Sequence, residues 1–568
     1  MATAAAPTDR DRASQEEARR VATAAKRARP ALAELTQPDI DRIVDAMAAA
    51  ARARAEEFAR LAVEETGFGI VADKIAKNLF SSDRVHAFIR PMTTVGVVRR
   101  DEAKKVVEIA EPFGVVAAII PSTNPTSTAI YKILIALKAR CPIALSPHPS
   151  AAHCITRVAE VMADAAAGAG APAGAIEWMR TVTLAGTQEL MQHRDVAVIL
   201  ATGGMGLVRA AYSAGKPAYG VGPGNAPCYI ERTADLAKAA RDIVTGRTFD
   251  NGVLCSSPNS VVVDQAVEGE VRREFIRQGA HFLSRTETEK VAAVLVTPQR
   301  LSNPALVGKS ACFVAERAGI TVPASTTVLI AELAGVGRDY PLSVEKLCPV
   351  LAYYVVADWR EGCERCIQIL RYGGMGHTMS IHSQNEPVIL EFGLKKPAFR
   401  IVVNTPTSHG SIGLTTGLDP AMTLGCGGYG GNITSDNISP RHLLNIKRLA
   451  YEIRPAAAAG RAAVSAPALP KAPSVPVDRG LAADVVRAQF AAPVESRPPA
   501  AAPEPDAGSA GADRPVPFVC EEDVRQAVKA GRRIVIGERT IVTPAARDLA
   551  RAHGTFIEAG WPGAGGRA

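Results

Sequence analysis

One cysteine of the ten in this 568-residue chain has neighbours that favour chemistry. Cys255 lies in FDNGVLCSSPNS (249–260), where small and polar residues follow a turn-like Asp-Asn-Gly. A substrate can reach a thiol in such a glycine-hinged loop, and neighbouring amides can lower the thiol pKa toward the reactive thiolate. We therefore interpret Cys255 as a candidate nucleophile, with a buried structural sulfur as the alternative.

Two further segments carry side chains that could assist a nucleophile. In IIPSTNPTSTAI (119–130) a strand ends and presents Asn124. Its amide could donate to a developing oxyanion, an interaction worth roughly 3 kcal/mol in a well-organised site. In GGMGHTMSIHS (373–383), His377 could take a proton from an incoming thiol, since imidazole titrates near neutrality. Ordinary Asn-Pro turn chemistry and a structural histidine are the alternatives.

A glycine-rich stretch could bind an anion. In LATGGMGLVRAAYSAGK (200–216) a strand runs through Thr202 into Gly203, Gly204 and Gly206, and then directly into a helix. Glycines let backbone amides approach a phosphate, and the helix N-terminus adds a favourable dipole. The spacing is not G-x-G-x-x-G, so a tight turn without a ligand remains the alternative.

The hydrophobic pattern predicts the scaffold that must position these residues. After a helical segment at 12–90, short apolar runs alternate with helical stretches: 114–121, 142–147, 196–204, 260–264, 327–333 and 350–356. Strand runs separated by 10 to 20 helical residues are typical of parallel sheets with crossover helices. Ligands of such sheets bind at the carboxyl ends of the strands, where the polar insertions lie. We expect two α/β domains, with Cys255 near their boundary.

Composition and charge exclude several classes of protein. The net charge of +8 arises from 65 basic and 57 acidic residues that are mixed along the chain, so nucleic-acid binding is not expected. No run of about 18 apolar residues and no secretory signal occurs, which indicates a cytoplasmic protein without membrane spans. The single C-x-x-C pair, Cys363 and Cys366, has no second pair, so we expect core packing and no metal site.

Taken together, seven segments resemble the aldehyde dehydrogenase superfamily. The resemblance is to its CoA-acylating branch, which includes the aldehyde dehydrogenase part of bifunctional aldehyde-alcohol dehydrogenases and the acylating enzymes of bacterial microcompartments. It spans about residues 60–450. The segments occur in the same order: EETGFGIVADKIAKN, IIPSTNPTSTAI, LKARCPIALSPHPSA, ATGGMGLVRAAYSAGKPAYGVGPGN, FDNGVLCSS, EKLCPVLAYY and MTLGCGGYGGN. Seven motifs in register make chance a poor explanation.

The resemblance implies roles for matching positions. Cys255 would add to an aldehyde to give a thiohemiacetal, Asn124 and the Cys255 amide would hold its oxyanion, and hydride transfer to a nicotinamide would leave a thioester. Glu345 would grip the nicotinamide ribose, and His377 would assist coenzyme A. The cofactor-binding positions implied in this way are Ser122, Ser146, His148, Pro149, Thr202, Gly203, Gly204, Gly206, Gly222 and Glu345.

Two departures from hydrolytic relatives bear on the subclass. Gly220 stands where those enzymes carry a glutamate base, so the acyl group should pass to coenzyme A and not to water. Ser146 replaces a lysine that commonly contacts the adenosine ribose, so we expect NAD while NADP stays open. A hydrolytic aldehyde dehydrogenase and an inactive scaffold protein are the alternatives. Family resemblance also implies a small aldehyde, such as acetaldehyde or propionaldehyde, and a homodimer or homotetramer.

The expected organisation follows this resemblance. We assign a helical lead-in to the cofactor domain (1–105), an NAD-binding domain (106–226), a catalytic domain (227–420), a return to the cofactor domain or oligomerisation segment (421–453), an Ala- and Pro-rich flexible linker (454–518) and a small module (519–560). The sequence TIVTPAARDLARAHG in that module resembles tails of microcompartment enzymes. Val524, Ala527 and Val528 form an apolar stripe that we expect to dock on shell or cargo proteins, or on the enzyme itself.

Overall fold

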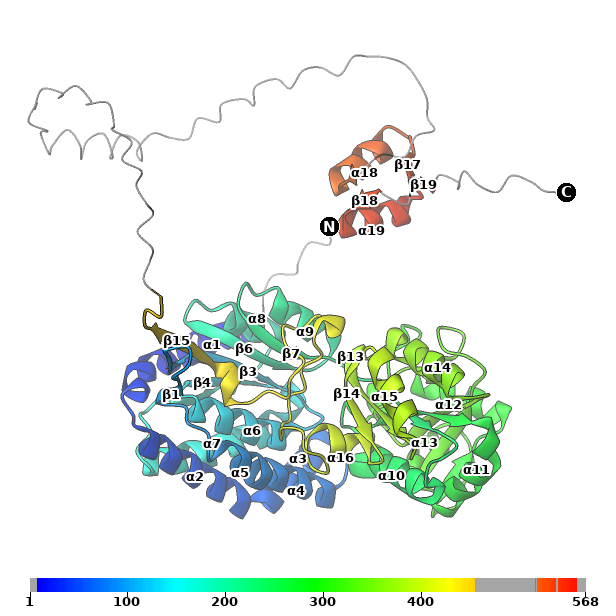
Figure 1. Cartoon of the computed structure of the whole chain (residues 1–568), viewed down its shortest axis with the longest axis horizontal. Helices are drawn as coiled ribbons and strands as arrows, with labels where there is room; N and C mark the ends of the chain where they lie inside the picture. Colours follow the sequence, from blue (N-terminus) through cyan, green and yellow to red (C-terminus); the bar gives the residue numbers. More distant parts are fainter. Residues whose placement is uncertain (1–7, 455–515, 517, 538–539, 559–568) are drawn as a thin grey trace, which may run out of the picture. The chain divides into compact units, whose positions relative to one another are not determined.

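The computed structural model describes residues 8–454, 516, 518–537 and 540–558 (Figure 1). The chain forms two compact units, Met1–Ala456 and Ala457–Ala568. The predicted linker, 454–518, falls almost entirely outside the described residues. Among the residues that are described, no helix is long and apolar enough to cross a membrane.

Helices form the first part of the larger unit. They are α1 (Asp9–Ala33), α2 (Gln37–Ala53), α3 (Ala55–Thr66), α4 (Val71–Leu79), the π-helical turn η1 (Phe80–Val85) and α5 (His86–Ile89). The side chains of Thr8 and Thr36 accept from the third helical amide and so begin α1 and α2 with capping boxes. An apolar stripe on α2, formed by Ile40, Ile43, Val44 and Met47, is buried against the first sheet domain.

A five-stranded parallel sheet follows, in the order β5-β4-β3-β6-β7. Its strands are β3 (Val115–Ile120), β4 (Ile143–Pro147), β5 (Ile176–Trp178), β6 (Val196–Thr202) and β7 (Ala218–Val221), connected by α6 (Pro125–Lys138), α7 (Ala152–Gly168), α8 (Leu184–Gln192) and α9 (Met205–Tyr212). From the central strand β3 the chain adds β4 and β5 on one side of the sheet, and it then crosses back to add β6 and β7 on the other side. Ligands bind at the carboxyl ends of strands at such a reversal, so β3 and β6 locate the first half of the site.

A seven-stranded sheet forms the second domain, and all its neighbouring strands run parallel in the order β10-β11-β12-β9-β8-β13-β14. The strands are β8 (Ala226–Ile230), β9 (Pro258–Asp264), β10 (Ala280–Phe282), β11 (Val328–Glu332), β12 (Val350–Val356), β13 (Gly376–His382) and β14 (Ala398–Val403). The helices around it are α10 (Leu236–Thr248), α11 (Glu268–Arg277), α12 (Arg285–Leu295), α13 (Ala311–Arg317), α14 (Trp359–Tyr372) and α15 (Glu386–Lys395), with α16 (Thr407–Ser411) after β14. The prediction of two α/β domains is confirmed.

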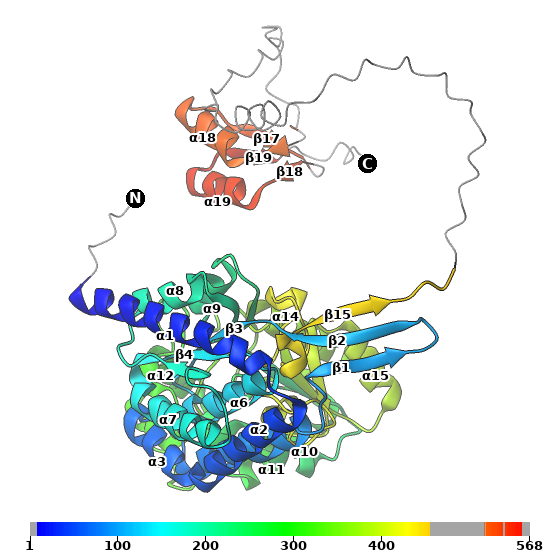
Figure 2. The same ribbon diagram turned by 90° about the vertical axis from the view of Figure 1, so that its left-hand side faces the viewer.

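Three antiparallel strands extend from the first domain as an arm: β1 (Gly96–Asp101), β2 (Val106–Pro112) and β15 (Leu444–Ala450) (Figure 2). The segment 106–112 therefore pairs with residues from the far end of the unit and not with the parallel sheet, which begins at Val115. Its apolar residues gave no indication of this partner, since strand pairing is set by tertiary contacts.

The smaller unit contains β16 (Phe518–Val519), α18 (Glu521–Lys529), β17 (Ile534–Ile536), β18 (Ile541–Val542), α19 (Pro544–His553) and β19 (Phe556–Glu558), paired as two short parallel sheets. Helix α19 is capped by Thr543, whose Oγ1 accepts from the Ala546 amide at 3.3 Å. Most of the predicted apolar stripe packs within the smaller unit itself. Val524 and Ala527 are fully buried in the unit's own core, and of the three only Val528 is exposed, at 37%.

Candidate active site

A pocket of about 420 Å³ lies at the carboxyl ends of β3 and β6 and reaches Cys255. Most of the predicted site residues line it: Asn124, Cys255, Ser122, His148, Pro149, Thr202, Gly203, Gly204, Gly222 and Glu345. A larger hollow of about 1350 Å³ in the second domain contains none of them. Three predicted residues, His377, Ser146 and Gly206, are absent from the pocket lining.

Cys255 lies between α10 and β9, after a tight turn, η3 (Phe249–Gly252). Asp250, Asn251 and Gly252 all adopt left-handed backbone conformations, with φ of 51°, 52° and 74°. Such conformations are costly for residues other than glycine and persist where surrounding contacts enforce them. The turn brings the half-buried thiol to the floor of the pocket.

The surroundings of the thiol do not favour its ionised form. Burial, reinforced by the charge of Glu345, raises the pKa of Cys255 to about 12, and the opposing effect of Arg400 is smaller. The predicted lowering of this pKa is therefore wrong. Desolvation outweighs the nearby amides, so the thiol is protonated at neutral pH before substrates bind.

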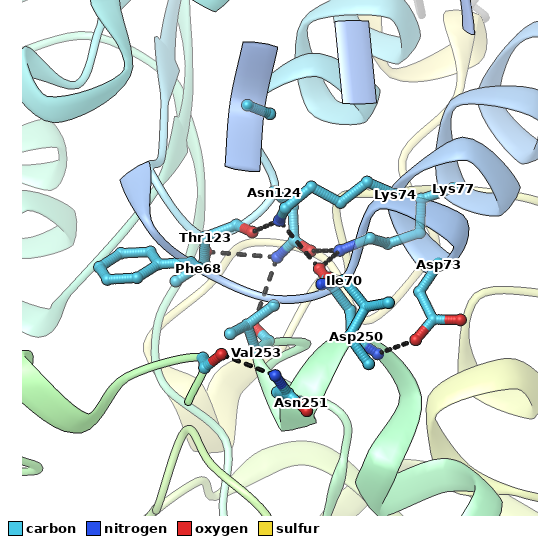
Figure 3. A network of polar contacts seen from close by, with 12 residues as sticks. Phe68, Ile70, Asp73, Lys74, Lys77, Thr123, Asn124, Asp250, Asn251 and Val253 are labelled. Atoms are coloured by element: carbon cyan, nitrogen blue, oxygen red, sulfur yellow. Dashed lines mark hydrogen bonds and ion pairs between the residues drawn. The ribbon is translucent and has the colours of Figure 1, made fainter. Parts of the chain in front are cut away.

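Asn124 precedes α6 and directs its side chain toward the loop that carries Cys255 (Figure 3). Its Nδ2 donates to Thr123 Oγ1 at 3.2 Å and to the Val253 carbonyl at 3.4 Å. Its Oδ1 accepts from Lys77 Nζ at 2.6 Å. The Nδ2 of Asn124 therefore faces the loop that carries Cys255.

Glu345 lines the pocket together with Cys255, and Gly224 lies against the Cys255 backbone. Glu345 Oε1 accepts from the Gly224 amide at 2.9 Å, and burial raises the pKa of Glu345 to about 7. A Cβ at position 224 would lie 2.0 Å from the Cys255 carbonyl oxygen, so only glycine fits there. Gly224 belongs to the segment GVGPGN (220–225) and was not predicted as a site residue. The glycine spacing of this segment is the signal that could have indicated close backbone approach.

The features at the end of β6 suit a dinucleotide. The strand ends at Thr202, whose hydroxyl is buried and has no hydrogen-bond partner among the described residues. Gly203 and Gly204 lead into α9, and a Cβ at Gly204 would meet nothing within 4 Å, so the pocket is open at this backbone. Amides at a helix N-terminus bind phosphate, and Leu207 supplies apolar surface.

Two predicted cofactor contacts have other positions. Ser146 is fully buried in β4, and its hydroxyl bonds to Thr187 Oγ1 at 2.8 Å. Gly206 is the second residue of α9, where helix amides have no intrahelical partner, but it does not line the pocket. Both residues support the pocket wall and neither lines the pocket.

His377 lies in β13, is buried and does not line the pocket. Its Nδ1 bonds to Thr378 Oγ1 at 2.9 Å, and its Nε2 is buried without a partner among the described residues. Burial, with a further contribution from Arg400, lowers the pKa of His377 to about 3. The expectation that it titrates near neutrality is therefore wrong, because the imidazole is held neutral in the interior.

The sequence did not predict an ion-pair cluster that contacts Asn124 through Lys77. Lys74 and Lys77 of α4 both contact Asp250 Oδ2, the Lys74 pair at 3.0 Å, and all three side chains are buried (Figure 3). Asp250 Oδ1 accepts from the Ile70 amide at 2.7 Å, and Asp73 Oδ2 accepts from the Asp250 amide at 2.7 Å. Two lysines three residues apart on one face of a short helix were the available signal.

The chain belongs to the aldehyde dehydrogenase family. The model of that family, described as "Aldehyde dehydrogenase family", matches residues 2–294. It is 42% identical over 430 residues to the bifunctional aldehyde-alcohol dehydrogenase AdhE of Escherichia coli (strain K12), covering 75% of this chain and 48% of that protein. The chain thus spans about half the length of that curated relative.

Two solved structures show the same fold over nearly their full length. An acetylating aldehyde dehydrogenase from Geobacillus thermoglucosidasius is 50% identical, with a TM-score of 0.77, and the match covers 78% of this chain and 98% of that one. A propionaldehyde dehydrogenase from the fucose utilisation bacterial microcompartment of Clostridium phytofermentans is 28% identical, with a TM-score of 0.69 and coverage of 77% and 97%. The predicted resemblance to the acylating branch and the predicted α/β fold are confirmed.

Proposed function

We propose that this protein is a CoA-acylating aldehyde dehydrogenase. It converts a small aldehyde, coenzyme A and NAD⁺ into acyl-CoA, NADH and a proton. The proposal rests on one observation: Cys255, Asn124 and Glu345 line the same pocket. In addition, Gly220 stands where hydrolytic enzymes carry the glutamate base, so no carboxylate is present at that position.

The first half of the reaction takes place on the cysteine. The Cys255 thiol loses its proton to solvent and its sulfur adds to the aldehyde carbon, which gives a thiohemiacetal oxyanion. The Asn124 Nδ2 and the Cys255 amide stabilise that charge, in a pocket where such donors act more strongly than in water. NAD, when bound along Thr202, Gly203 and Gly204, supplies the hydride acceptor. The cysteine then carries an acyl thioester.

The surroundings of Gly220 favour transfer to a thiol over hydrolysis. The Gly220 carbonyl accepts from the Tyr212 hydroxyl at 3.1 Å and from Asn432 Nδ2 at 2.7 Å. A Cβ at this position would lie 2.8 Å from both Tyr212 Oη and Val208 Cγ1, so the backbone has no room for a carboxylate. Without a general base, water attacks the thioester slowly, and the thiolate of coenzyme A is the better nucleophile.

For the cofactor we propose NAD, with NADP as the alternative. His148 and Pro149 line the pocket beyond β4, and burial lowers the pKa of His148, so that ring is neutral at physiological pH. A neutral ring offers no charge to a 2′-phosphate. Initial rates with both nicotinamides would decide between them.

The finer assignments rest on the relatives. We propose acetaldehyde or propionaldehyde as substrate, because similar structures are an acetylating and a propionaldehyde dehydrogenase. We also propose a homo-oligomer and a place inside a bacterial microcompartment of the cytoplasm, reached through the smaller unit. A chain ending at residue 456 should remain active but no longer co-purify with shells. Co-purification of the shortened chain would refute the targeting role.

The activity is tested by following NADH at 340 nm with acetaldehyde or propionaldehyde, with and without coenzyme A. We expect turnover that depends on coenzyme A, an acyl adduct on Cys255 by mass spectrometry when coenzyme A is omitted, and no turnover by Cys255→Ala. Full-rate NADH formation without coenzyme A would instead indicate the hydrolytic alternative. Absence of any turnover would favour the scaffold alternative.

A further inference from the structure

Lys77 occupies a position between the two halves of the site. It lies on α4, far in sequence from both the amide at 124 and the nucleophile loop (249–255), yet its ammonium touches both. It donates to Asn124 Oδ1 at 2.6 Å and contacts Asp250 Oδ2 (Figure 3). The side chain is only 2% exposed, so this contact excludes water.

The contact determines which end of the Asn124 amide faces the nucleophile. The two ends of an asparagine amide have nearly the same shape, so packing alone does not distinguish them. An ammonium has three donors and no acceptor, so it pairs only with the carbonyl oxygen. With Oδ1 held by Lys77, Nδ2 must point toward the Val253 carbonyl and the thiol loop. A flipped amide would present an acceptor to the oxyanion and repel it.

The same ammonium connects this amide to the backbone that carries the thiol. Asp250 is in the strained turn before Cys255, and its carboxylate also accepts from the Ile70 amide. Lys77 therefore bridges the oxyanion donor and the nucleophile loop through one charged atom. Charge-assisted hydrogen bonds are shorter and about twice as strong as neutral ones, so they hold geometry well.

We propose that Lys77 is a positioning residue for aldehyde oxidation, acting through Asn124: it orients the oxyanion-binding amide and ties it to the Cys255 loop. This inference rests on the proposed function. Lys77 polarises the amide as well, because a donor on Oδ1 makes the Nδ2 hydrogens better donors.

Lys74 provides a matched control. It is on the same helix, equally buried, and contacts the same Asp250 oxygen, but its second hydrogen bond goes to the Thr123 carbonyl at 3.3 Å and not to Asn124. Lys77→Met and Lys74→Met each leave Asp250 one lysine. The two variants therefore remove equal charge from the cluster and differ in the contact with the amide.

The experiment compares kcat for NADH formation in these two variants. Removing one oxyanion donor costs roughly 10²- to 10³-fold in kcat, so we expect Lys77→Met to lose about 10²-fold and Lys74→Met less than about tenfold. The rate of Cys255 alkylation by iodoacetamide, a reaction without an oxyanion, should be the same in both variants. In an Asn124→Ala background, Lys77→Met should cost less than about twofold further, because the group through which it acts is gone.

Lys77→Arg and Lys74→Arg repeat the comparison with the charge kept, so the test does not depend on folding of the methionine variants. Lys77→Arg should retain more activity than Lys77→Met, because it still has donors for Oδ1. Equal kcat in Lys77→Met and Lys74→Met, or a full additional loss in the Asn124→Ala background, would overturn the inference alone. A wild-type enzyme without activity would overturn the proposed function and this inference with it.

Discussion

Replacing Gly224 by alanine should lower the catalytic rate without changing the fold. The added Cβ would lie 2.0 Å from the Cys255 carbonyl oxygen, whereas real Cβ atoms essentially never approach within 3.0 Å. One of the two backbones must therefore move by about 1 Å, a misplacement that can cost roughly 10²-fold in rate at a reacting centre. Gly224 also donates to Glu345, so the same movement disturbs that side chain in the pocket lining.

The assay is NADH formation with saturating aldehyde, coenzyme A and NAD. We expect kcat of Gly224→Ala to fall by about 10²-fold while circular dichroism shows the native fold, because the strain is local. Gly393→Ala is the control: its Cβ meets nothing within 4 Å inside α15, so kcat should be unchanged and stability should rise by about 0.5–1 kcal/mol. If Gly224→Ala keeps kcat within twofold of wild type, the close approach does not position the thiol.

Three further predictions concern buried positions. Because the pKa of Cys255 is raised to about 12, the rate of its alkylation by iodoacetamide should rise close to tenfold per pH unit from neutrality to about pH 9. A rate that is constant near neutrality would contradict a protonated thiol. Gly220→Glu should lower the Tm and should not produce free acid without coenzyme A, because the new side chain would collide with Tyr212. Release of acid at the rate of acylation would refute this prediction. Burial lowers the pKa of His382 to about 3, below the value of about 6.5 in the unfolded chain. Below about pH 6.5, unfolding therefore takes up a proton. The free energy of unfolding should fall there by up to ~1.4 kcal/mol per pH unit. Urea unfolding between about pH 7 and pH 5 should show a shallower decline for His382→Gln, and an unchanged slope would refute the assignment.

Much of the site could be predicted because its residues belong to local patterns. The strands before Asn124 and Gly203 are apolar runs bounded by turn residues, and strand ends in a parallel sheet meet at one edge. The small residues around Cys255 indicated a loop that a substrate can reach. Residues that act through such local geometry are visible in the sequence, and these three all line the pocket.

The electrostatic character of the site is a tertiary property. Cys255 and His377 are surrounded by segments that are distant in sequence, so the loss of hydration that shifts both pKa values has no local signal. The pairing of Lys77 with Asp250 spans 173 positions. The order of the chain alone determined which groups are available for chemistry. Only the packing of α4 against the nucleophile loop decided which of them are charged, which are neutral and which end of the Asn124 amide faces the thiol.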